Sequence, residues 1–159
     1  MPFRYRLQKI LEIRIRKKEE QLQAVIKAQE EVDRIELLII KNIEEIKSLN
    51  QQKRMADPMM FETYDNFIRH LWEKDEKLKQ EKLEALQQLE KEKELLKVRE
   101  QEVNVLEKHK DHQHEDYLQE QKKAELKELN EIGSQKFFLR NRDKQEEIEL
   151  EELNKKNAN

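Results

Sequence analysis

The segment RMADPMMF, residues 54–61, decides the fold, because it interrupts a chain that otherwise has helix-forming residues throughout. Proline disfavours helical geometry in the residue before it but suits the first turn of a helix. Asp57 is therefore expected to cap a new helix, with Pro58 as its first helical residue. The chain holds only one glycine and two prolines, so no other interior break is as strong.

Before this segment, hydrophobic residues recur with the seven-residue spacing of a coiled coil, which predicts a first helix from about residue 4 to 56. One core position holds Leu11, Val25, Val32, Ile39 and Ile46, and the position three residues later holds Ala28, Ile35 and Leu49. Lys18 and Asn42 interrupt this seam, as polar residues that fix helix register often do.

After a turn at about 56–58, the spacing predicts a second helix from about residue 58 to 140. One series recurs at sevens and another begins four residues after it ends: Tyr64, Leu71, Leu78 and Ala85, then Leu89, Leu96 and Val103. This shift predicts a stutter, which locally unwinds a coiled coil. Helices joined by a short turn bury each other's apolar stripes by lying antiparallel. We therefore predict an all-α, antiparallel two-helix coiled-coil hairpin, with a parallel dimer of one continuous rod as the alternative.

The two predicted helices differ in length, about 80 Å against about 120 Å at the rise of an α-helix. The longer second helix should overhang the first beyond about Tyr117, within a single hairpin domain of residues 1–140. Residues 141–159 are expected to form a charged, frayed C-terminal tail. The overhang is rich in large apolar residues, namely Leu126, Leu129, Ile132, Phe137, Phe138 and Leu139. Either it folds back or frays, or it is a docking tip for another protein.

Several function classes are excluded by composition. A single glycine cannot build a Walker A loop, a GxGxxG turn or a GxSxG nucleophile elbow. Without cysteine, thiolate zinc sites and cysteine nucleophiles are impossible. His109, His112 and His114 suggest a metal site, but their spacing does not place all three on one helix face, so an exposed polar patch is expected. We expect a protein that is not an enzyme and that holds no cofactor or metal.

Charge and hydropathy limit the partners. A net charge of −3 gives little attraction to nucleic acid, and the longest aliphatic run, LLII at 37–40, is too short to span a bilayer. The start of the chain is basic with interleaved apolar residues, which fits an anionic membrane surface, an acidic protein or a solvated helix face. After the turn, an apolar cluster is either packing at the apex of the hairpin or a binding patch: Tyr64, Phe67, Ile68, Leu71 and Trp72.

Three motifs in order resemble the flagellar export protein FliJ family, over about residues 3–140. The start FRYRLQKIL is similar to the family's F-x-(F/Y)-R-L-Q-x-(L/I)-L, through Phe3, Tyr5, Arg6, Leu7, Gln8, Ile10 and Leu11. A Y-x-x-F-I-x-x-L stripe follows the turn as Tyr64, Phe67, Ile68 and Leu71. The closing block EQKKAELKELNEIGSQKFF resembles the family's end through Glu125, Lys127, Asn130, Glu131, Ile132 and Phe137. Gly133 stands where the family usually has alanine or serine, so a kink is possible there.

The resemblance implies a non-catalytic stalk of the flagellar type III protein export apparatus, supporting flagellum assembly and chemotaxis-related motility. Implied partners are the hexameric export ATPase FliI, the export-gate protein FlhA and free export chaperones, at the cytoplasmic face of the bacterial inner membrane. Candidate contacts with the ATPase ring are Phe3, Arg4, Arg6, Ile132, Phe137, Phe138 and Arg140. Candidate contacts with the gate are Tyr64, Phe67 and Leu71. The alternatives are an injectisome stalk, a membrane-surface coiled coil and a generic coiled-coil adaptor.

Overall fold

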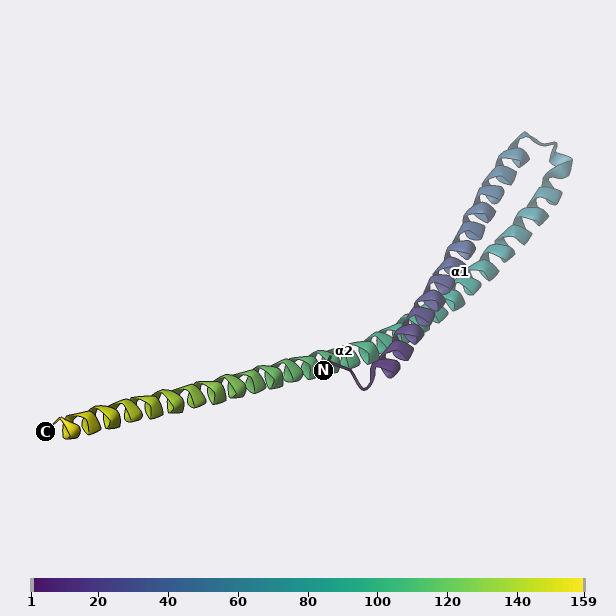
Figure 1. The fold of residues 1–159 in the computed structure, drawn as a ribbon. Coiled ribbons are helices and arrows are strands. Elements are labelled where there is room, and N and C mark those ends of the chain that lie inside the picture. Colours follow the sequence, from purple (N-terminus) through teal and green to yellow (C-terminus); the bar gives the residue numbers. More distant parts are fainter. Residues whose placement is uncertain (1, 159) are drawn as a thin grey trace. The chain divides into compact units, whose positions relative to one another are not determined.

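The computed structural model describes residues 2–158, and these form two long helices joined by a tight turn (Figure 1). Helix α1 comprises Gln8–Met55, the 3₁₀ turn η1 comprises Pro58–Met60, and α2 comprises Phe61–Asn157. No strand occurs among the described residues. The prediction of an all-α helical hairpin is confirmed.

The turn has the predicted capping chemistry. Ala56 leaves helical geometry with φ −87° and ψ 161°, which ends α1. The Asp57 carboxylate then accepts a hydrogen bond from the Met59 backbone N–H at 3.2 Å, and Pro58 begins η1. Proline disfavours helical geometry in the residue before it, and it fits the first turn of a helix because the N–H that it lacks would have no partner there. Asp-Pro therefore ends one helix and starts the next within a few residues.

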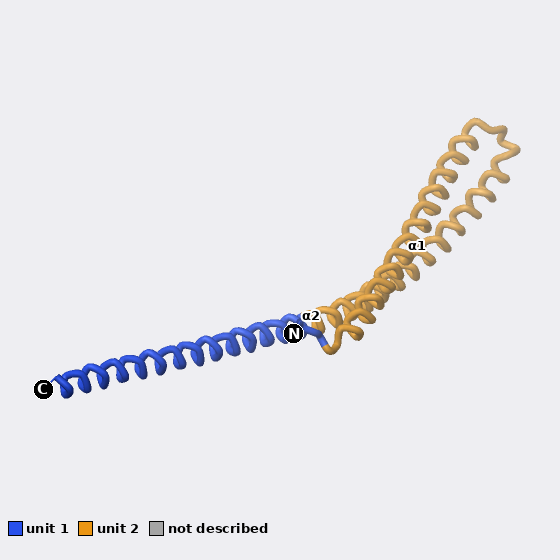
Figure 2. The backbone as a smooth tube through the Cα atoms, in the orientation of Figure 1, with its two compact units in different colours: residues 1–5, 108–159 blue, residues 6–107 orange. Residues whose placement is uncertain are grey.

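The chain divides into two compact units (Figure 2). One comprises residues 6–107, which include α1, the turn and the first part of α2. The other comprises residues 1–5 and 108–159, of which 2–5 and 108–158 are described.

Within residues 6–107 the two helices lie antiparallel and bury the predicted seam. Ile46 packs with Ile68 and Leu71, and one level further along the hairpin Asn42 donates from Nδ2 to the Leu71 carbonyl at 2.9 Å. Three heptads beyond Asn42, Gln21 donates from Nε2 to the Glu92 carbonyl at 3.0 Å and to Glu92 Oε2 at 2.5 Å. The residue numbers of the pairs Ile46–Ile68, Asn42–Leu71 and Gln21–Glu92 each sum to 113 or 114, so the register is constant from the turn to Gln21.

The predicted stutter was therefore wrong. Leu89, Leu96 and Val103 do not continue the series of Tyr64 after a shift, since they belong to a second core position that begins at Ile68. Polar residues occupy that second position at Asp75 and Lys82, and the first position at Glu92 and Arg99, and all four are buried or half-buried. The heptad repeat is uninterrupted, but a search for hydrophobic residues alone does not detect it at these four positions.

Three polar residues of α1 at one heptad position reach across to the backbone of α2. Besides Asn42 and Gln21, Arg14 donates from a guanidinium nitrogen to the Glu102 carbonyl at 3.4 Å. Asn42 is only 2% exposed, so losing its bond would leave a buried amide unpaired. Polar groups that bond at one register only disfavour sliding of the helices, which is how such residues specify pairing.

Asp75 is the most deeply buried charged side chain of the described seam. It is 0% exposed and lies seven residues after Ile68, so the constant register places it level with Ile39. Its Oδ2 lies 2.8 Å from Lys79 Nζ, while Oδ1 has no hydrogen-bond partner within the described chain. The hydrogen bond and charge of Asp75 raise the pKa of Lys79 above its usual value. A carboxylate with one unsatisfied oxygen in an apolar seam makes the fold less stable than an apolar residue would at that position.

Both helices have bounds that differ from those expected. α1 begins at Gln8 and not near residue 4, because residues 2–5 are not helical and their aromatic side chains contact α2. α2 continues to Asn157 and does not end near residue 140, because residues 141–157 lack proline and glycine and are mostly strong helix formers. Fraying of the last turns in solution stays a prediction.

Candidate functional site

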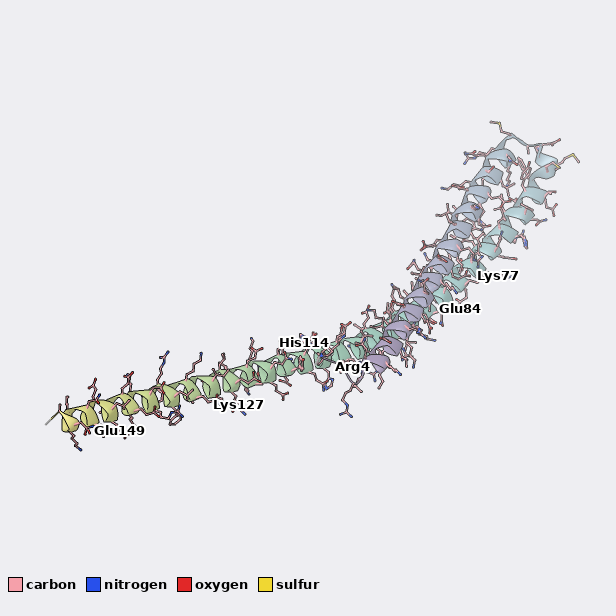
Figure 3. All side chains as sticks on the ribbon, in the orientation of Figure 1. Arg4, Lys77, Glu84, His114, Lys127 and Glu149 are labelled. Carbon is pink, nitrogen blue, oxygen red and sulfur yellow. The ribbon has the colours of Figure 1, made fainter. Side chains whose placement is uncertain are left out.

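The end of α2 forms an unpaired helix that we call the free segment, residues 118–158. Every residue in it is exposed, and Figure 3 labels two of them, Lys127 and Glu149, on this part of α2. Phe137 is 61% exposed and Phe138 is 71% exposed, with their ring centroids 6.2 Å apart. Burying one phenylalanine is worth about 1.5–3 kcal/mol, so this bare pair is a strong candidate for contact with a partner.

Apolar side chains occupy more than one face of the free segment. Leu126, Phe137 and Ile148 recur every eleven residues, which is close to three helical turns, so they share one face. A second face of the helix holds Ile132, Leu139 and Leu150. These residues are spaced by seven and then eleven positions, which are close to two and three full helical turns, so they lie above one another. All six are about half exposed or more. A partner that covers this segment must contact it from more than one side.

Gly133 lies inside α2 without kinking it. The helix is continuous from Phe61 to Asn157, no described residue has a positive φ, and an added Cβ at Gly133 would meet nothing within 4 Å. The possible kink inferred from the sequence is absent.

Replacing Gly133 with alanine should therefore stabilise the free segment by about 1 kcal/mol, because alanine removes the conformational entropy cost of glycine without a clash. Far-UV circular dichroism of a peptide covering residues 118–158 should show higher helicity for G133A. Lower helicity would show that Gly133 holds a geometry other than the straight helix.

The N-terminal residues 2–5, which we call the strap, contact α2 just before the free segment. Tyr5 is buried, and its Oη lies 2.9 Å from His109 Nδ1, within hydrogen-bonding distance. Phe3 meets His114 edge to face with centroids 5.0 Å apart, and Tyr117 at 5.6 Å. Figure 3 shows Arg4 and His114 in the same part of the molecule, and Arg4 lines a shallow groove with Pro2, Phe3, Gln113, Asp116, Tyr117 and Glu120.

The spacing of the strap's contacts with α2 is the one expected of an extended segment. Two strap residues, from Tyr5 to Phe3, advance about 6.6 Å, which nearly matches the rise of about 7.5 Å from His109 to His114 along a helix. The histidine cluster is thus a docking face for aromatic residues. Within residues 2–158 no group of three or more His, Asp or Glu side chains is placed to hold a metal ion.

The residues expected to contact one ring do not all lie together. Phe3 contacts His114 and Tyr117, whereas Phe137 lies twenty residues after Tyr117 on the same helix, about 30 Å along its axis. Arg4, Arg6 and Arg140 are exposed, and Ile132 is 49% exposed. A single small docking spot cannot include both the strap and the phenylalanine pair.

Comparison with known protein families adds the deciding observation. The model of the Flagellar FliJ protein family matches residues 3–142, which is most of the chain. The chain belongs to the flagellar FliJ protein family. No curated protein and no solved structure matches it.

Family membership makes this FliJ chain a component of the flagellar export apparatus, and the family is non-catalytic. No helix in residues 2–158 has the length and hydropathy needed to cross a membrane. The family match ends at residue 142, whereas α2 continues to Asn157. The last helical turns, with Ile148, Leu150 and Leu153 exposed, therefore lie outside the matched region.

The candidate gate contacts of this FliJ chain differ in accessibility. Leu71 is 4% exposed and packs against Ile46 and Ile68 inside the hairpin, so its side chain is not available to a partner. Tyr64 is half-buried, and Phe67 is 48% exposed. Trp72 is 49% exposed at a position that flanks the seam. Of the three residues expected here, Phe67 is the one with a large accessible surface.

The residues that contact the strap are the part of this site that the sequence analysis does not predict. His109, His114 and Tyr117 were considered separately, as a polar patch and as the end of the apolar stripe. The available signal was the pair Phe3 and Tyr5, two aromatic residues two positions apart before the first helix. Two residues of an extended segment cover about the same length as five residues of a helix. This match pairs the two aromatic residues with residues 109 and 114.

Proposed function

We propose that this protein is a non-catalytic stalk of the flagellar type III export apparatus, and that the part of its free segment up to Arg142 docks in the ring of the export ATPase FliI. The observation that carries the proposal is the exposure of residues 118–158, with Phe137 and Phe138 as its largest apolar groups. The apolar residues lie on more than one face of the helix. A ring that surrounds the helix can cover all of these faces, whereas a flat surface can cover only one.

The surface proposed for the ring extends along the helix. Phe3 and Arg4 lie at its beginning, Ile132, Phe137, Phe138 and Arg140 lie about 30 Å further on, and Arg6 follows the strap. A helix inserted along the axis of a ring would be contacted over such a length. A contact of this kind favours assembly of the ring, because one helix can bind several subunits at once.

Changing Phe137 and Phe138 together to alanine should weaken the effect on the ATPase. Two phenylalanines that become buried on docking contribute at least about 3 kcal/mol, so the half-maximal concentration should rise about 100-fold or more. The measurement is ATP turnover and hexamer formation by purified FliI, titrated with wild-type or F137A/F138A protein.

The matched control replaces Ile148 and Leu150 with alanine, since this pair is similarly exposed but lies outside the family-matched region. It should leave the titration nearly unchanged. Equal titration curves for F137A/F138A and wild-type protein would remove the phenylalanine pair from the docking surface.

The second helix is the proposed site for the export gate FlhA, through Phe67 and the half-buried Tyr64. Leu71 supports this surface from inside the hairpin without touching the partner. Free export chaperones are further proposed partners. The proposed location is the cytoplasmic face of the bacterial inner membrane, where the protein is held by the export apparatus.

A further inference from the structure

The strap contains Phe3, which the proposed function places in contact with the ATPase ring. Phe3 is half-buried, with its ring against His114 and Tyr117, and is therefore already engaged within the chain. Tyr117 is itself held in place, because Gln121 donates from Nε2 to its Oη at 2.5 Å. A partner cannot surround the Phe3 ring while these contacts persist.

The start of helix α1, which follows the strap, lacks the usual stabilising residues of a helix N-terminus. Helix α1 starts after Leu7, which forms no side-chain cap, and its first turn contains no acidic residue. The nearby charges are basic, at Arg6 and Lys9, and positive charge disfavours a helix N-terminus. The strap contacts α2 through Tyr5 on His109 and through Phe3 on His114 and Tyr117.

We propose that residues 2–5 are a displaceable strap, which stores Phe3 on α2 in the free protein and releases it when the ATPase ring docks. This inference rests on the proposed function for the identity of the partner. Release frees the Phe3 ring from His114 and Tyr117, so the docking surface gains Phe3 when the strap opens. The strap thus acts as an autoinhibitory contact, because the apparent affinity equals the affinity of the open form multiplied by the fraction of time that the strap is open.

The first arm of the test measures opening without any partner. Trp72 is the only tryptophan, so a W72F/F3W protein carries a single reporter in the strap. Acrylamide quenching of its fluorescence reports how open the strap is. Changing His114 to alanine removes one ring contact, and the ratio of open to closed strap should rise about two- to tenfold.

His112 provides a matched control within the same cluster. It is exposed on α2, and no ring contact with the strap involves it, so H112A should leave the quenching unchanged. Far-UV circular dichroism confirms that each variant keeps its helices. Quenching that is the same for H114A, H109A and wild-type strap would overturn the proposal.

The second arm measures docking with Phe3 and Trp72 restored. Because H114A keeps all the proposed ring contacts but loosens the strap, it should lower the half-maximal concentration for FliI by the factor found in the quenching arm. Weaker or unchanged docking by H114A would overturn the autoinhibitory role. A wild-type protein with no effect on FliI would overturn the proposed function and the role of release with it, whereas the quenching arm would still decide whether the strap opens.

Discussion

Replacing Asp75 with leucine should raise the free energy of unfolding by about 1–4 kcal/mol, the range seen when buried ionic groups are replaced by apolar residues of similar volume. Asp75 is fully buried at a seam position, and one carboxylate oxygen has no hydrogen-bond partner within the described chain. Leucine would fill the position next to Ile39 without that desolvation cost. Lys79, whose side chain is 54% exposed, can turn to solvent. Thermal and urea denaturation followed by circular dichroism measure the gain.

The matched control is E76L, because the Glu76 side chain is 78% exposed on the adjacent position and carries the same charge. It should change stability by no more than about 0.5 kcal/mol. The contact with Lys79 offsets part of the cost of burying Asp75 at pH values below the usual pKa of lysine. This contribution to the folded state is lost as the pH rises through the raised pKa of Lys79. The advantage of D75L should therefore widen in alkaline solution. A D75L protein less stable than wild type would show that the ion pair outweighs its desolvation.

Ending the chain after Lys123 should abolish the response of FliI while leaving the melting temperature of the hairpin unchanged. The removed residues include Phe137 and Phe138, but every described one of them is exposed, so no packing is lost. Gln121, which bonds to Tyr117, is retained. ATP turnover with purified FliI measures the first effect, and thermal denaturation measures the second.

A chain that ends after Arg142 is the control for this truncation. It keeps the family-matched region and the phenylalanine pair, so its effect on FliI should resemble that of the full chain. A large drop in the melting temperature on truncation after Lys123 would mean that the free segment folds back onto the hairpin in solution. An intact FliI response in that chain would place the docking surface elsewhere.

The hairpin was predictable from the sequence because its two determinants are local. Asp57 and Pro58 specify one helix end and one helix start through chemistry that depends on a few neighbouring atoms. The α1 seam was predictable because Leu11, Val32 and Ile46 are apolar at a constant spacing. The α2 register was not, since Asp75 and Lys82 are charged residues at core positions and a hydrophobicity pattern treats them as surface.

The site was predictable only in part, for a related reason. Exposure of Phe137 and Phe138 follows from comparing two helix lengths, which needs no side-chain detail. Leu71 belongs both to the seam and to the family's apolar stripe, so the sequence does not show whether its side chain is buried or faces a partner. The contact of Phe3 with His114 joins residues more than one hundred positions apart through an extended segment, and helical spacing rules do not describe such a segment.

The polar contacts from Arg14, Gln21 and Asn42 have an evolutionary consequence. Each donates to a main-chain carbonyl of α2, and a carbonyl is present whichever amino acid occupies that position. The acceptor half of every such contact is therefore insensitive to substitution, whereas the donor half is lost by a single change in α1. Tolerance to mutation should be unequal between the two helices, with the shorter one carrying the information that aligns them.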